Sequence, residues 1–222
     1  MFKMSGLIGA AMLLGAIWAP VSVSAEAAYD LLFRNGTLDS IDRDTALLYR
    51  RDVTNALNPE AATRDTGDIA LSFDATNTAL AQLEFRQDGK ARSLGRFPAS
   101  VGNPMIMYFY ESVVRDMAET AGGSPFYIRN RVKDALVQTT PAVAGEAVVA
   151  GRTVPTVTVT LVPFADDPNH ARMRGFGDLA LKITMSEAVP GWYMSLRAET
   201  SPNGGEAVYR SELVFERLET AQ

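Results

Sequence analysis

Cysteine is absent from the 222 residues, and histidine occurs once, as His170. The lack of cysteine excludes disulfide bonds, thiolate chemistry and the attachment of a lipid to an N-terminal cysteine. A single histidine cannot form the histidine pairs of zinc hydrolases, and the chain contains neither a G-x-S-x-G elbow nor a phosphate loop. We therefore predict no catalytic residues, no cofactor and no metal site, and we expect a protein that is not an enzyme.

Carboxylate pairs are the catalytic option that these absences leave open, but they cannot be located among 26 acidic residues. Asp116 is the acid of most interest, because it borders the apolar arc of an expected helix. Burial there raises the pKa of a carboxyl group unless an arginine pairs with it, and we expect such an ion pair. The segment 166–170 is acidic but lacks the turn glycine of calcium loops, so we expect an ordinary polar loop.

Positive charge is also scarce. The chain has 21 basic and 26 acidic residues and a net charge of −5. Proteins that bind nucleic acids present a basic surface, so we predict no nucleic-acid partner.

The N-terminus has the three parts of a secretory signal peptide. Lys3 supplies the charge, residues 7–18 form an apolar run, and small residues lead to Ala25, after which we expect cleavage. The run is too short to span a hydrocarbon core of about 30 Å. We therefore predict residues 1–25 as the signal peptide of a periplasmic protein that is not an integral membrane protein after cleavage.

Residues 26–222 are expected to form a single β-rich domain, because a chain of this length can bury roughly 70% of its unfolded surface. Apolar and polar residues alternate in many short segments, which is typical of half-buried antiparallel strands. Asp88-Gly89 predicts a tight hairpin turn. We expect a surface loop over 55–67, and the segment 137–149 is ambiguous. The expected strands cover 29–33, 46–53, 69–73, 81–85, 91–97, 157–161, 179–185, 192–196 and 209–215.

Residues 103–136 are the one long segment with helical periodicity. Asn103-Pro104 and Ser124-Pro125 each predict a helix start, because Asn and Ser cap helices and proline suits the first turn. Gly122 and Gly123 end the first helix, so the segment predicts a helical hairpin. The fold class follows: an α+β protein with a curved antiparallel sheet, or an incomplete β-barrel, covered by this central hairpin.

The first expected helix is rich in methionine and apolar over an arc of roughly 200°, wider than the usual stripe. Methionine adapts to irregular apolar ligands, so a gap between helix and sheet could hold one. An ordinary filled core is the alternative. Glu111, Arg115 and Glu119 form a polar ridge that we interpret as a solvated face. The candidate ligand-binding residues are Met105, Phe109, Met117, Trp192 and Met194.

The second expected helix has a narrow apolar stripe and a basic, aromatic face. Aromatic and cationic side chains together suit contact with anionic lipid headgroups or an acidic partner. A solvated helix face is the alternative. The candidate contact residues are Phe126, Tyr127, Arg129, Arg131 and Lys133.

In the segments GNPMIMYFYESVVRDMAETAGGSPFYIRNRVKDAL and SEAVPGWYMSL, the chain resembles uncharacterised exported, β-rich proteins of Gram-negative bacteria. This resemblance carries over no functional residue. The order of strands, helices and strands is also similar in layout to periplasmic lipoprotein-carrier proteins, whose incomplete barrel is closed by helices and takes up acyl chains.

Three functional hypotheses remain. The leading one is a periplasmic, non-enzymatic protein that binds a lipid or another apolar ligand between sheet and helices. The alternative is an envelope protein that binds a partner protein through the basic helix face. The third is a hydrolase that uses two carboxylates about 5 to 10 Å apart in a cleft.

Overall fold

The computed structural model describes residues 21–23, 25–138, 140–200 and 206–221. The apolar run of the predicted signal peptide, residues 7–18, lies outside this range. None of the helices in the described range combines the length and the apolar character needed to cross a membrane.

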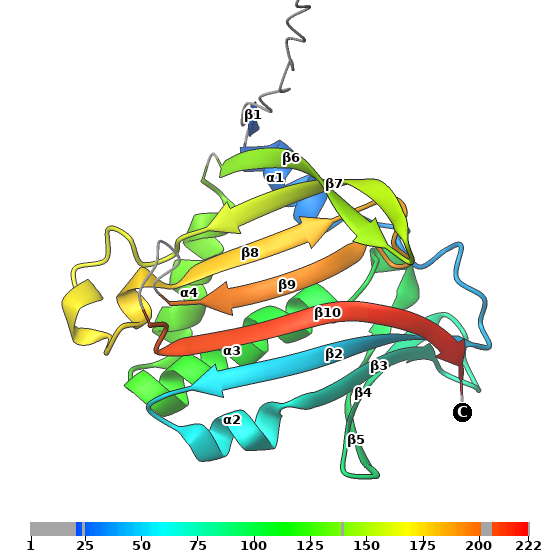
Figure 1. Cartoon of the computed structure of the whole chain (residues 1–222), viewed down its shortest axis with the longest axis horizontal. Coiled ribbons are helices and arrows are strands. Elements are labelled where there is room, and N and C mark those ends of the chain that lie inside the picture. Colours follow the sequence, from blue (N-terminus) through cyan, green and yellow to red (C-terminus); the bar gives the residue numbers. More distant parts are fainter. Residues whose placement is uncertain (1–20, 24, 139, 201–205, 222) are drawn as a thin grey trace, which may run out of the picture.

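The described strands form one open antiparallel sheet, in the order β1-β6-β7-β8-β9-β10-β2-β3-β4-β5 (Figure 1). The strands are β1 (Val21–Val23), β2 (Thr45–Asn55), β3 (Gly67–Phe73), β4 (Leu80–Gln87), β5 (Lys90–Pro98), β6 (Thr140–Val149), β7 (Arg152–Leu161), β8 (Ala180–Met185), β9 (Tyr193–Glu199) and β10 (Tyr209–Thr220). The helices are α1 (Ala25–Leu32), α2 (Pro59–Asp65), α3 (Met105–Ala121) and α4 (Pro125–Leu136), with short 3₁₀ turns η1 (Ala99–Val101), η2 (His170–Arg172) and η3 (Phe176–Asp178).

Strand order explains the position of the helical hairpin. Strands β2 to β5 form one meander and β6 to β10 another, and the two meet where β10 pairs with β2. Strand β5 is one edge of the sheet, whereas β6 lies at the opposite side, next to the short β1. The chain must therefore cross the sheet between β5 and β6, and α3 and α4 lie along this crossing (Figure 1).

The core lies between the sheet and the two helices. Met105, Phe109 and Val113 of α3 are fully buried in one apolar cluster with residues of the central strands, such as Leu47 and Leu196. The other face of the sheet carries ion pairs, for example Arg86 with Glu84 at 2.8 Å. The predicted fold class, a curved antiparallel sheet covered on its apolar face by a central helical hairpin, is confirmed.

Local sequence signals set the helix and hairpin ends. The Asn103 Oδ1 accepts a hydrogen bond from the Met105 amide at 2.9 Å, as expected for a cap. Gly122 ends α3 with a positive φ of 80°. Asp88 and Gly89 have φ of 51° and 71°, which is the tight turn predicted between β4 and β5. Ser124 precedes α4 but makes no capping bond with its side chain.

Two sequence-based expectations about secondary structure are corrected, and one segment left ambiguous is assigned. Residues 29–33 were expected to form a strand, but most of them belong to α1, where Ala28 and Leu32 are buried at the four-residue spacing of a helix. The expected loop 55–67 contains α2, whose start is capped by the Asn58 side chain on the Ala61 amide. The ambiguous segment 137–149 contains β6.

A β-bulge breaks the expected alternation in β9. Tyr193 pairs with Met185 and Ser195 pairs with Thr184, so Met194 has no partner on β8. Strict alternation over 192–196 would place Met194, a predicted ligand-binding residue, on the covered face and Tyr193 on the exposed face, but Tyr193 is buried and Met194 is half-buried. An extra residue in one strand reverses the faces on one side of it, which explains the error.

Candidate functional site

The centre of α3 is packed rather than hollow. Met105 and Phe109 are 0% exposed and Met117 is 2% exposed, all within the main apolar cluster. Neither Met105 nor Phe109 lines any of the cavities described below. Met105 and Phe109 are therefore packed as in an ordinary filled core.

An apolar cleft lies at the turn between α3 and α4, and we call it the helix-turn cleft. Its volume is about 410 Å³, within the range of small-molecule sites. The end of α3, the start of α4 and the loop around η2 form its walls. The lining residues are Met117, Ala121, Gly122, Gly123, Ser124, Tyr127, Ile128, Asn169, Arg172 and Met173.

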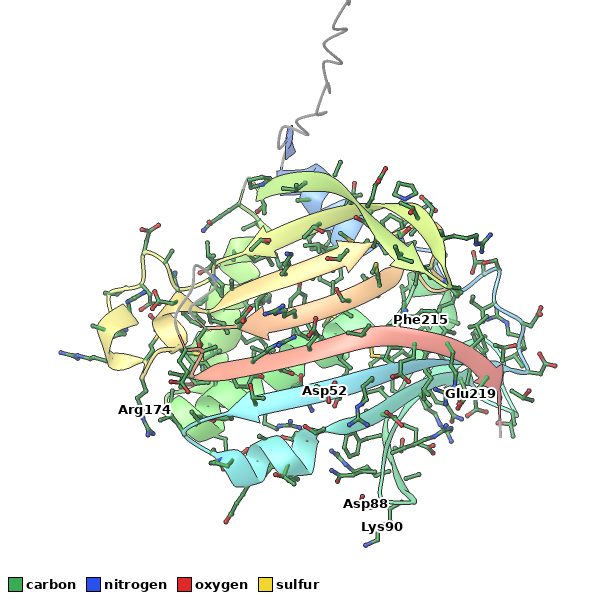
Figure 2. All side chains as sticks on the ribbon, viewed as in Figure 1. Asp52, Asp88, Lys90, Arg174, Phe215 and Glu219 are labelled. Atoms are coloured by element: carbon green, nitrogen blue, oxygen red, sulfur yellow. The ribbon has the colours of Figure 1, made fainter. Side chains whose placement is uncertain are left out.

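Hydrogen bonds fix the loop that closes this cleft. The Tyr127 hydroxyl donates to the Asp167 carboxylate at 2.6 Å, and the Arg131 Nε lies 2.9 Å from the same oxygen. Burial raises the pKa of Asp167, but the hydrogen bonds from Tyr127 and the Asn169 amide bring it below its usual value. Arg174, labelled in Figure 2, donates to the Thr120 carbonyl at 2.7 Å and ties the loop to α3. The cleft is therefore preformed.

The cleft combines apolar walls with one cation. Met117, Ile128 and Met173 are buried residues that form its apolar side. Arg172 is exposed and makes no ion pair with any described residue. Such a cleft can bind an apolar chain and leave an anionic end near Arg172.

The basic face of α4 is largely neutralised by acidic partners. Arg129 forms two hydrogen bonds of 2.7 Å with Glu111, and Arg131 contacts Asp134 and Asp167. Lys133, by contrast, has no ion pair within the described ranges. Phe126 precedes the cleft residue Tyr127 and is 76% exposed. Among the predicted contact residues, Phe126 and Lys133 thus remain available to a partner.

Trp192 belongs to a different cavity, of about 490 Å³, beside Arg34 and Glu187. Its Nε1 donates to the Leu31 carbonyl at 2.9 Å, and the Arg34 guanidinium lies 4.6 Å from its ring centre. Met194 lines neither cavity. The five predicted ligand-binding residues therefore do not line one cavity. Of these five, only Met117 lines the helix-turn cleft, together with Tyr127 from the predicted contact residues.

The predicted arginine partner of Asp116 is confirmed, and there are two. Arg51 approaches Asp116 at 2.9 Å and Arg115 at 2.8 Å, and the Tyr209 hydroxyl donates to it at 2.8 Å. Asp65 shares Arg115 with Asp116 and also pairs with Arg64. Burial raises the pKa of Asp65, but these arginines lower it below its usual value. The carboxylate hydrolase hypothesis requires a general acid, and a carboxyl group with a lowered pKa, such as that of Asp65, is unsuited to this role.

Asp167 and His170 of the acidic loop 166–170 also have partners within the protein. Asp167 accepts a hydrogen bond from Tyr127 of α4, and the His170 ring lies 3.1 Å from Asp178. Within the described ranges, no three acidic or histidine side chains cluster as metal ligands would.

No protein-family model and no curated protein sequence matches the chain. Among solved structures, the fold is similar to the crystal structure of the lipoprotein LppX of Mycobacterium tuberculosis. The similarity has a TM-score of 0.36 and 10% sequence identity, and it covers 88% of this chain and 96% of that chain. At this TM-score the likeness carries no information about the function of this chain.

Residues of the loop before β8 were missed as site residues. Asn169, Arg172 and Met173 follow no strand or helix period, and only the tertiary contact with α4 brings them to Met117. Met173 in a polar loop is the one signal that could have drawn attention to this segment.

Proposed function

We propose that the protein is an exported, non-enzymatic binder of an apolar ligand such as a lipid acyl chain, held in the helix-turn cleft. The observation that carries the proposal is the preformed cleft of about 410 Å³ with methionine and isoleucine walls. The signal-peptide-like N-terminus supports a periplasmic location. The site lies at the end of the helical hairpin and not between the centre of α3 and the sheet.

Apolar burial supplies the affinity in this proposal. Each methylene removed from water contributes about 0.8 kcal/mol, which is close to a fourfold change in the dissociation constant. A cleft of fixed volume accommodates only a limited chain, so the gain ends once the cleft is full. Arg172 at the cleft pairs with a carboxylate or phosphate headgroup, as a guanidinium commonly does.

The first experiment is native mass spectrometry of the mature protein, purified from the periplasm without detergent, followed by lipid extraction. We expect an apolar adduct at up to one molecule per chain. A titration with saturated fatty acids of increasing length then measures the dissociation constant. We expect it to fall about fourfold for each added methylene and then level off.

A cleft-filling variant makes the test specific. Ala121→Trp places a large side chain in the cleft and should weaken binding of the longest fatty acid at least tenfold. Val137→Trp, at an exposed position after α4, is the matched control and should bind like the native protein. A dissociation constant that does not depend on chain length, or full binding by a folded Ala121→Trp variant, would refute the proposal.

A further inference from the structure

A third cavity, which shares no lining residue with the helix-turn cleft, lies between the β4–β5 hairpin, α2 and the outer side of α3. We call it the hairpin groove. Its volume is about 640 Å³. Four cationic side chains from three elements line it: Arg64, Lys90, Arg92 and Arg115. Figure 2 shows Lys90 and Asp88 at the projecting tip of the hairpin.

The two carboxylates at the base of the groove are already neutralised. Asp65 accepts hydrogen bonds from Arg64 at 2.8 and 3.2 Å and from Arg115 at 2.9 Å. Glu119 accepts two from Arg64, at 3.0 and 2.9 Å. The hydrogen bonds from Arg64 keep the pKa of Glu119 below its usual value. These two acids hold the arginines in place, and the third carboxylate that lines the groove, Asp88, lies at the tip of the hairpin and makes no ion pair with a described residue.

Arg115 is oriented by buried groups and keeps one nitrogen free. Its Nε and Nη2 donate to Asp116, and Nη2 also donates to Asp65. Asp116 and Asp65 are 5% and 2% exposed, so they fix the guanidinium from behind. Its Nη1 has no hydrogen-bond partner among the residues that the structure describes, although Arg115 lines the groove. A guanidinium held in this way is preorganised for an oxyanion.

Lys90 and Arg92 add positive charge without counter-ions. Neither forms an ion pair with a described residue, and both line the groove from β5. The Arg92 guanidinium lies 4.8 Å from the ring centre of Phe85, which holds it over the groove wall. Cations on edge strands also prevent unwanted pairing. Lys90 and Arg92, however, lie two residues apart on one strand face and line the same groove as Arg115. This convergence favours a ligand with several oxygen acceptors.

We propose that the hairpin groove binds a phosphate group carried by a small organic molecule or a lipid headgroup. Arg115, Lys90 and Arg92 contact the phosphate oxygens, and the groove wall at Phe85 and Ala91 contacts the organic part. A phosphate dianion matches three convergent cations better than a single carboxylate does. This site is independent of the helix-turn cleft, so either assignment can fail alone.

Calorimetric titration of the mature protein with phenyl phosphate at low ionic strength tests the proposal. We expect saturable binding that the double variant Lys90→Ala and Arg92→Ala weakens at least tenfold. The control double variant, Arg152→Ala and Lys182→Ala, removes the same net charge from exposed positions outside the groove and should bind normally. Co-sedimentation with vesicles that contain phosphatidic acid, whose headgroup is a phosphate monoester like phenyl phosphate, distinguishes the sources, because binding lost in the groove variant assigns the phosphate to a membrane. Absence of saturable binding of both probes, or equal weakening by the two double variants, would overturn the proposal.

Discussion

Replacement of Asp116 by asparagine should cost about 3 to 5 kcal/mol of unfolding free energy, because the Arg51 guanidinium would be left buried without its carboxylate. Arg51 is 0% exposed, and Asp116 is the carboxylate with which it forms an ion pair in the described structure. The guanidinium cannot lose its proton to escape the penalty. Since a domain is typically stabilised by about 5 to 15 kcal/mol, this loss would be a large fraction of the total.

The reciprocal change should be less costly. In Arg51→Met, Asp116 keeps its hydrogen bonds to Arg115 and Tyr209, so no buried charge is left unpaired. We expect a loss of about 1 to 3 kcal/mol. The double variant Arg51→Met and Asp116→Leu replaces the buried pair by apolar side chains and should be more stable than Asp116→Asn, as is found when a buried ion pair is exchanged for hydrophobic residues.

Urea unfolding, followed by circular dichroism, measures these differences. Asp134→Asn is the matched control, since it removes an exposed partner of Arg131, and it should change the unfolding free energy by at most about 1 kcal/mol. The slope of free energy against urea should stay constant. If Asp116→Asn costs no more than Arg51→Met, the reasoning about an uncompensated buried charge is refuted.

Four further predictions follow from the same structure. The pKa of Asp65 is lower in the folded state than in the unfolded chain, so its stabilising contribution should be present above about pH 4 and lost as the pH falls below that value. Asp65→Asn should therefore reduce the slope of the urea midpoint against pH. An unchanged slope would contradict this prediction. If the alternative hypothesis of an envelope partner bound to α4 holds, the combination Phe126→Ala and Lys133→Glu should abolish co-purification of that partner without changing the urea midpoint, whereas retained co-purification would count against a contact surface on α4. Intact-mass analysis of the exported protein should show a chain that begins after Ala25, and a mass that includes residues 21–23 would disprove this cleavage site. Gly191→Ala should reduce the unfolding free energy by more than about 1 kcal/mol in urea, because Gly191 has a φ of 76° and the added Cβ would lie 2.4 Å from Leu47. A smaller loss of unfolding free energy would mean that the Gly191 turn relaxes.

Much of the fold is readable from local patterns. Alternation in 69–73 and 81–85 predicts β3 and β4 because each strand has one covered face. The same period misassigns 29–33, since a short apolar segment can fit either a strand or a helix. Helix α2 was missed although Asn58-Pro59 repeats the start signal of Asn103-Pro104. Its seven residues bury too little apolar surface to produce a helical stripe.

The polar network of the core was only half predictable. Asp116 was identified from its place on the apolar arc of α3, but Arg51 was not. Arg51 shares a strand face with Tyr49 and Val53, so a charge at an inward position was the available signal. The ridge of Glu111, Arg115 and Glu119 is exposed, as the interpretation of a solvated face requires, but its ion-pair partners were not predicted: they are Arg129, Asp65, Asp116 and Arg64. Such pairings depend on tertiary distances, which sequence spacing does not contain.

The central place of β10 has a consequence for how the chain folds. Strand β10, which follows all the other described strands in the sequence, joins the two meanders because it lies between β9 and β2. Until residues 209–220 are available, each half-sheet has an open edge and contacts must form between distant parts of the chain, which slows folding. A nascent chain that lacks these residues therefore stays unfolded for longer. Slow closure of this kind would keep the chain extended for passage through a secretion channel, as the proposed export requires.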